Sequence, residues 1–139
     1  MMRNVILTTG LVFMSAAAGP ETNLAAIVRA GNNQLVTPTN PINPKDTIVI
    51  FLTGMGQTIP AVQAGLPAPQ NPLAAATVAP TVTLGGMPLS VSYAGLSPDE
   101  VGVYQINATV PAGVPVGISV PLIINQGGAA TTIDVRVVN

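Results

Sequence analysis

The second half of the sequence alternates apolar and polar residues in short runs that end at glycine or proline. Within residues 81–138, Gly85-Gly86 and Gly127-Gly128 each separate two such runs. Side chains of a β-strand point alternately to opposite faces, so this period of two predicts strands with one buried face. Paired glycines allow the positive φ angles that tight hairpin turns need. Because no segment sustains the helical period of 3.6, we expect an all-β fold.

The first half supplies further strands and one long connection. Residues 24–36 are typical of a small hairpin with a turn at Gly31 to Asn33, and Thr47 to Thr53 is apolar on both faces, which predicts a central buried strand. Ile59 to Pro80 contains five prolines and predicts an extended surface connection. We therefore expect an immunoglobulin-like β-sandwich of about seven to nine strands over residues 19–139. Its predicted core includes Ile50, Leu52, Val91, Tyr104, Ile106, Val120 and Val135, and the alternation also places Tyr93 and Ile118 inward.

The first 18 residues form a separate apolar segment that has two interpretations. A basic start, an apolar stretch and small residues at Ser15 to Ala18 are typical of a cleaved secretory signal peptide. The same stretch can be retained as a strand that completes the sheet of a neighbouring subunit, with residues 15–20 as a hinge. The residues expected to form this donated strand are Val5, Ile6, Leu7, Leu11, Val12 and Phe13.

The scarcity of charge limits the functions that this chain can have. Only 6% of its residues are charged, against about 25% in an average soluble domain, and the net charge is -1. Binding of nucleic acid is not expected, because the chain lacks a basic cluster. It contains neither cysteine nor histidine, so it lacks the usual nucleophile-base pairs and the commonest metal ligands. We expect no enzymatic activity and no cofactor.

Three small features have a functional and a structural interpretation. Thr53-Gly54-Met55-Gly56 follows a strand as a dinucleotide-binding loop does, but the third glycine and the helix are missing, which favours a plain turn. Ser97-Pro98-Asp99-Glu100 predicts one short helical turn, with a calcium site as the less favoured alternative. Tyr93 and Tyr104 are expected to pack in the core with their hydroxyls at its rim, although they could instead form a platform for stacking sugars.

Four stretches carry a resemblance to a known family, over residues 23–139. They are Asp46 to Thr58, Ala64 to Pro69, Tyr93 to Asn107 and Val110 to Pro115. In this order they resemble the bacterial extracellular Ig-like domain family of the Solibacter-type C-terminal module, which is similar in architecture to IPT/TIG domains. The resemblance implies a non-enzymatic module of secreted proteins and brings no active site with it.

Together these features predict an extracellular structural protein, secreted or at the cell surface. An edge strand with few charges pairs readily with another chain, so we expect a homo-oligomer or a polymer such as a fibre or filament, without a transmembrane span. The alternative is a monomeric secreted adhesion or carbohydrate-binding module that uses the connection at residues 59–80.

Overall fold

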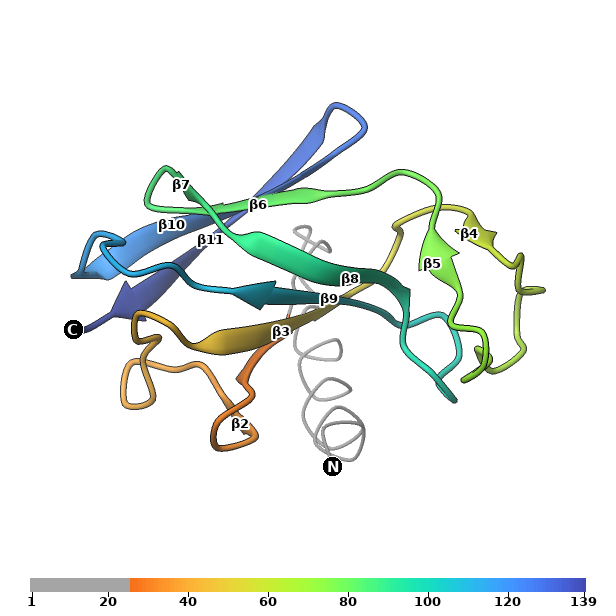
Figure 1. The fold of residues 1–139 in the computed structure, drawn as a ribbon, viewed down its shortest axis with the longest axis horizontal. Helices are drawn as coiled ribbons and strands as arrows, with labels where there is room; N and C mark the ends of the chain where they lie inside the picture. The colour runs from red at the N-terminus through yellow and green to blue at the C-terminus, as the bar shows by residue number, and fades with distance from the viewer. Residues whose placement is uncertain (1–25) are drawn as a thin grey trace.

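A computed structural model describes residues 26–139, which form two packed antiparallel β-sheets (Figure 1). This part of the chain contains no helix, so the all-β sandwich is confirmed. It has eleven strands, and four of them are only two residues long. The proposed donated strand, with Val5, Ile6, Leu7, Leu11, Val12 and Phe13, lies outside the described residues.

The larger sheet has seven strands in the order β2-β1-β3-β9-β8-β5-β4. Thr47 to Leu52 forms a central strand that is buried on both faces, as its sequence predicts. The predicted hairpin at residues 24–36 supplies the two strands at one end of the sheet. The bounds are β1 Ala26–Arg29, β2 Gln34–Leu35, β3 Thr47–Leu52, β4 Thr58–Ile59, β5 Ala75–Ala76, β8 Ser90–Leu96 and β9 Tyr104–Thr109.

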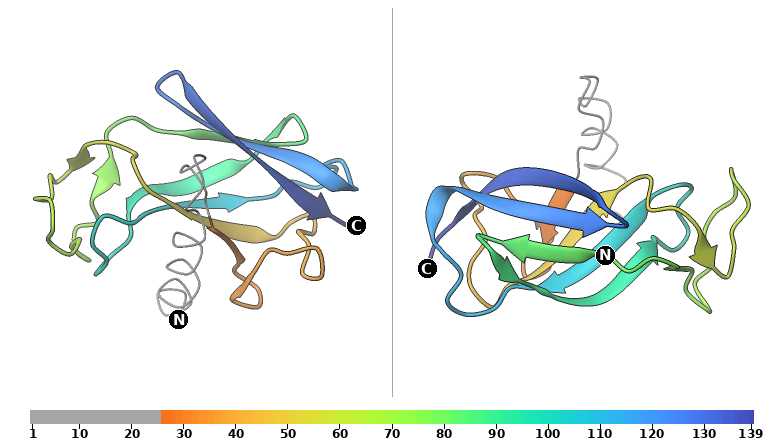
Figure 2. Two further views of the ribbon diagram at one scale, coloured as in Figure 1. Left: turned by 180° about the vertical axis from the view of Figure 1, so that it is seen from behind. Right: turned by 90° about the horizontal axis from the view of Figure 1, so that it is seen from above.

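The smaller sheet has four strands in the order β11-β10-β6-β7 and covers one face of the larger sheet (Figure 2). Both predicted glycine turns form tight hairpins: Gly85-Gly86 joins β6 to β7, and Gly127-Gly128 joins β10 to β11, with positive φ at all four glycines. The chain then crosses between the sheets at Leu89, which is buried. The bounds are β6 Thr81–Leu84, β7 Met87–Pro88, β10 Gly117–Gln126 and β11 Ala129–Val137.

The main core lies between the sheets and follows the predicted alternation. Ile50 and Ile106 from the larger sheet are fully buried, and Val120 and Val135 from the smaller sheet are buried with them. The remaining predicted core residues, Leu52, Val91 and Tyr104, are partly buried and pack against this cluster. A second cluster lies on the other face of the larger sheet, where Ala26, Val28, Val49 and Phe51 are buried together.

A β-bulge makes one predicted inward position wrong. In the β10–β11 ladder, Gly117 pairs with Val137 and Val120 pairs with Val135, so three steps on β10 match two on β11. The extra residue reverses the alternation at this end of β10. Ile118 is therefore 86% exposed, although the sequence pattern places it in the core.

A second bulge makes the predicted inward position of Tyr93 wrong. Val91 pairs with Ala108 and Tyr93 pairs with Asn107, which leaves Ser92 as an extra residue in β8. Ala94, rather than Tyr93, then faces the main core opposite Ile106. Tyr93 consequently lies on the outer face of the larger sheet.

Two local predictions are also wrong. The connection at residues 59–80 is not only a surface loop, because β4 and β5 lie within residues 58–76 and extend the larger sheet (Figure 1). Its Ala68 and Ala74 are buried in a small cluster with Leu96. The helical turn expected at residues 97–100 does not form, since Asp99 has a positive φ of 67° and its N–H donates to the carbonyl oxygen of Ala68.

Candidate functional site: an open sheet edge

The Thr53–Gly56 segment is a structural turn. Gly54 and Gly56 adopt positive φ angles of 83° and 86°, and the side chain of Met55 between them is buried in the main core. The carbonyl oxygen of Met55 accepts a hydrogen bond of 2.9 Å from the Gln126 side chain. The prediction of a plain turn is confirmed, and the backbone of this turn also binds the side chain of Gln126.

The acidic pair Asp99 and Glu100 is part of the local structure. Gln70 donates a hydrogen bond to the Asp99 carboxylate, and Glu100 is buried. Among residues 26–139, no group of three or more acidic, histidine or cysteine side chains is placed to hold a metal ion. The alternative calcium interpretation gains no geometric support from these residues.

The two tyrosines have different roles. The hydroxyl of Tyr104 donates to the carbonyl oxygen of Gly56, so this ring packs in the core with its hydroxyl at the rim, as expected. On the outer face, the Tyr93 hydroxyl lies 3.1 Å from the Ala74 carbonyl oxygen and 2.9 Å from that of Leu96. Burial raises the pKa of the Tyr93 phenol, because the charged form would lose solvent. Both hydroxyls therefore bind backbone and tie the β4–β5 lobe to the sandwich.

The edges of the two sheets differ in how they are protected. β2 and β4 end the larger sheet and β7 ends one side of the smaller sheet, and each of these strands is only two residues long. β7 also contains Pro88, which cannot donate a backbone hydrogen bond. Very short strands and proline are ordinary ways to prevent edge-to-edge pairing. β11 ends the other side of the smaller sheet and has nine residues.

The register shows which backbone groups of β11 face outward. The two-residue turn makes Gln126 and Ala129 the first hydrogen-bonded pair, and in an antiparallel ladder such pairs alternate with non-bonded ones. Ala130, Thr132 and Asp134 therefore direct their N–H and C=O groups away from β10. In the described part of the chain no strand pairs with β11 on this side. The side chains of these three residues are exposed.

Ile42 closes only the far end of this edge. Its N–H donates to the Arg136 carbonyl oxygen, and its own carbonyl accepts from the Val138 N–H, both at 3.0 Å. The Arg136 side chain reaches back to the Pro38 carbonyl oxygen at 2.6 Å. The open edge is thus limited to residues 129–135, where Asp134 carries the one charge.

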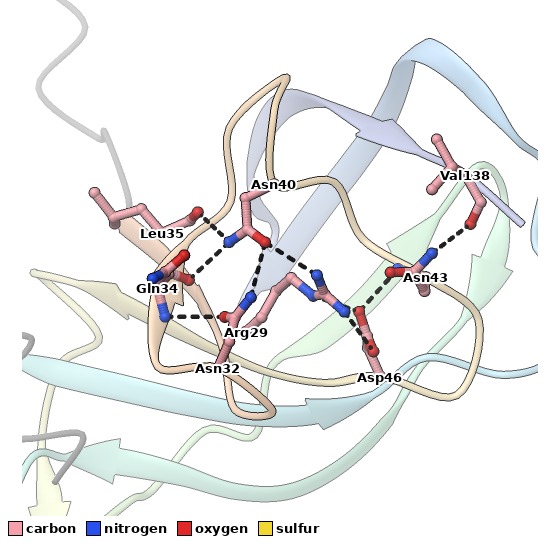
Figure 3. A network of polar contacts seen from close by, with 8 residues as sticks. All are labelled: Arg29, Asn32, Gln34, Leu35, Asn40, Asn43, Asp46 and Val138. Carbon is pink, nitrogen blue, oxygen red and sulfur yellow. Dashed lines mark hydrogen bonds and ion pairs between the residues drawn. The ribbon is translucent and has the colours of Figure 1, made fainter.

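A polar network fixes the segment that carries Ile42 (Figure 3). The Arg29 guanidinium forms an ion pair of 2.8 Å with Asp46 and donates to the Asn40 side chain at 3.0 Å. Asp46 also accepts from the Asn43 N–H, and the Asn43 side chain donates to the carbonyl oxygen of Val138. The positions of Arg29 and Asp46 in the sequence predict no contact between them. The network anchors the residue 37–46 loop beside the end of β11.

A recess opens next to the unprotected half of β11. Its volume is about 150 Å³, and it is open to solvent. Apolar and polar residues both line it: Leu52, Met55, Ile124 and Ala129, and Thr53, Gln126 and Thr131. The β10–β11 hairpin supplies one wall, and the end of β3 with the following turn supplies the other. The tip of this hairpin extends beyond the body of the sandwich (Figure 1). An apolar side chain next to the open edge could therefore enter between the sheets.

Comparison of the chain with family models, curated proteins and solved structures gave no match. The resemblance to the extracellular Ig-like family therefore stays a prediction. No helix within residues 26–139 has the length and apolar character that crossing a membrane requires.

Proposed function

We propose that this chain is a non-catalytic structural protein, secreted or at the cell surface, that assembles with copies of itself into a fibre or filament. The observation that carries the proposal is the open edge of β11, because the backbone groups of Ala130, Thr132 and Asp134 have no strand partner in the described part of the chain. Such an edge is a template for strand addition. A structural role also agrees with the complete lack of histidine and cysteine.

The charge of the chain supports association between copies. Charged side chains on an edge strand normally discourage pairing, yet the open stretch carries only Asp134. A net charge of -1 leaves little repulsion between identical subunits. Self-association therefore meets a weak electrostatic barrier.

The N-terminal apolar segment is the proposed donor. Its residues Val5, Leu7, Leu11 and Phe13 share one face of an extended strand, and an apolar strand of this kind is stable only when it is covered. A subunit that gives this segment to a neighbour and receives one from another neighbour forms a heterologous contact, and such contacts propagate into open filaments.

The oligomeric state tests this function directly. The full chain, with residues 1–15 shown to be present by intact-mass measurement, should form oligomers at micromolar concentration in light scattering and filaments in electron microscopy. Deletion of residues 1–15 should give monomers. A full-length chain that stays monomeric would contradict the proposal and favour the monomeric binding module.

A further inference from the structure

Resting on this proposed function, we infer that the acceptor of the donated strand is the β11 edge of a second copy, with the Phe13 ring in the recess beside it. The open stretch, residues 129–135, is long enough for a short strand, and its three outward residues each offer an N–H and a C=O group. The strands that end the other sheet edges in the described residues are two residues long. β8 also has an open side at Ser90 to Ala94, because β5 pairs with it only at Gly95, but this stretch is interrupted by the bulge at Ser92.

The recess determines which side chain enters the sandwich. Its volume of about 150 Å³ is close to that of one aromatic ring, and its lining combines the apolar Leu52, Met55 and Ile124 with the polar Thr53 and Gln126. Phe13 is the one aromatic residue in the proposed donor segment. Burial of a phenylalanine side chain is a strong contribution to binding.

The direction of the added strand follows from the position of the recess. Ala129 and Thr131, at the start of β11, line the recess, whereas Ile42 blocks the end of β11. A donor strand antiparallel to β11, with Phe13 opposite Thr131, places Leu11 beside Ile133, which is partly buried at the margin of the core. In this register residues 9–15 of the donor lie along the open stretch, and residues 5–7 extend past the end that Ile42 closes. Residues Val12 and Met14 then face the solvent side.

The described part of the chain begins at a place that bears on the reach of the donor segment. β1 begins at Ala26, which pairs with Phe51, and Phe51 precedes Leu52 in the wall of the recess. About ten residues separate the donor strand from β1, and at about 3.3 Å per residue they span roughly 33 Å. Because the start of β1 lies near the recess of its own subunit, the formation of oligomers is the result that distinguishes insertion into a neighbour from insertion into the same subunit.

The acceptor is tested by a matched pair of full-length variants at one position. Thr132→Pro removes an outward N–H that the domain does not use in its own ladder, so the fold should persist while strand addition fails. Thr132→Val keeps this N–H and should assemble as the unchanged chain does. Circular dichroism and thermal unfolding should show that both variants are folded.

The donor is tested in the same way. Phe13→Asp should abolish assembly because a carboxylate would have to enter the recess, whereas Met14→Asp lies on the solvent side and should not. A mixture of the Thr132→Pro and Phe13→Asp chains provides the decisive measurement. Each chain alone should be monomeric, but together they should form a one-to-one dimer, because one supplies an intact donor and the other an intact acceptor.

The possible results of these experiments distinguish a wrong acceptor from a wrong proposed function. If Thr132→Pro assembles normally while Phe13→Asp does not, strand donation holds and the β11 edge is not its acceptor. If the folded single variants are monomeric but their mixture forms no dimer, the pairing of this donor with this acceptor is wrong. If the unchanged chain is itself monomeric, the proposed function fails before the acceptor is considered.

Discussion

Replacement of Ile106 by alanine tests the placement of the main core. Ile106 lies in β9, is fully buried and faces Ile50 across the β3–β9 pair. Loss of about three carbons at about 0.8 kcal/mol each accounts for about 2.4 kcal/mol. The cavity left in a packed interior should raise the total destabilisation to about 3–4 kcal/mol.

Ile118→Ala is the matched control, because it makes the same chemical change at a residue that is 86% exposed. The small buried fraction contributes about 0.3 kcal/mol. The lower strand propensity of alanine keeps the total below about 1 kcal/mol. The two variants should therefore differ by at least about 2 kcal/mol.

Urea unfolding followed by circular dichroism measures both free energies. The midpoint should fall for Ile106→Ala with an unchanged slope, since a change in slope would indicate a different unfolded or native ensemble. Conditions that keep the chain monomeric remove the contribution of assembly to stability. Equal losses in the two variants would refute the bulge at residues 117–120 and the face assignment of this end of β10.

Gly95→Ala should lower the melting temperature while Gly31→Ala should not, because a Cβ at Gly95 would lie 2.3 Å from a backbone oxygen and one at Gly31 meets nothing within 4 Å; equal melting temperatures would contradict this close packing. Burial raises the folded-state pKa of Tyr93, so the stability it contributes is present below about pH 10 and is lost as the pH rises through the folded-state pKa. Tyr93→Phe should therefore lose less stability at alkaline pH, as measured by urea unfolding at several pH values. If its stability falls with pH as in the unchanged chain, Tyr93 is not the cause of that fall. Asp46→Ala should destabilise by about 1–3 kcal/mol in the same assay, since it breaks the ion pair and leaves its partners unsatisfied; a neutral result would make the network dispensable. EDTA should leave the melting temperature unchanged, and a large drop would reveal an oxygen-ligand metal site.

The sequence predicts the fold class because its signals are local. The strand that ends at Leu52 is apolar on both faces and lies in the centre of the larger sheet, and the two Gly-Gly pairs form the turns expected of them. These features depend on the residues themselves and on their immediate neighbours. The strong agreement of local signals is what allows an all-β fold to be predicted without a structure.

The errors arise where a partner strand decides the outcome. Ile118 and Tyr93 each follow the apolar period, but a bulge next to each reverses the face on which they lie. A bulge depends on the register with the opposite strand, which the local alternation does not contain. The Arg29–Asp46 pair was missed for a related reason, because its members are 17 residues apart and meet only after β1 and β3 have paired.

The open edge could not be predicted because the position of a strand in its sheet is a property of topology. Residues 131–138 show the same alternation as the other half-buried strands, and nothing in them indicates that β11 ends its sheet. Once the order of strands is known, the lengths of the four edge strands can be compared. Three edges are shortened to two residues, whereas the fourth keeps seven residues open and is closed only beyond them by Ile42. Water or an added strand can satisfy the backbone groups of this stretch, and the matched variants at Thr132 and Phe13 distinguish the two.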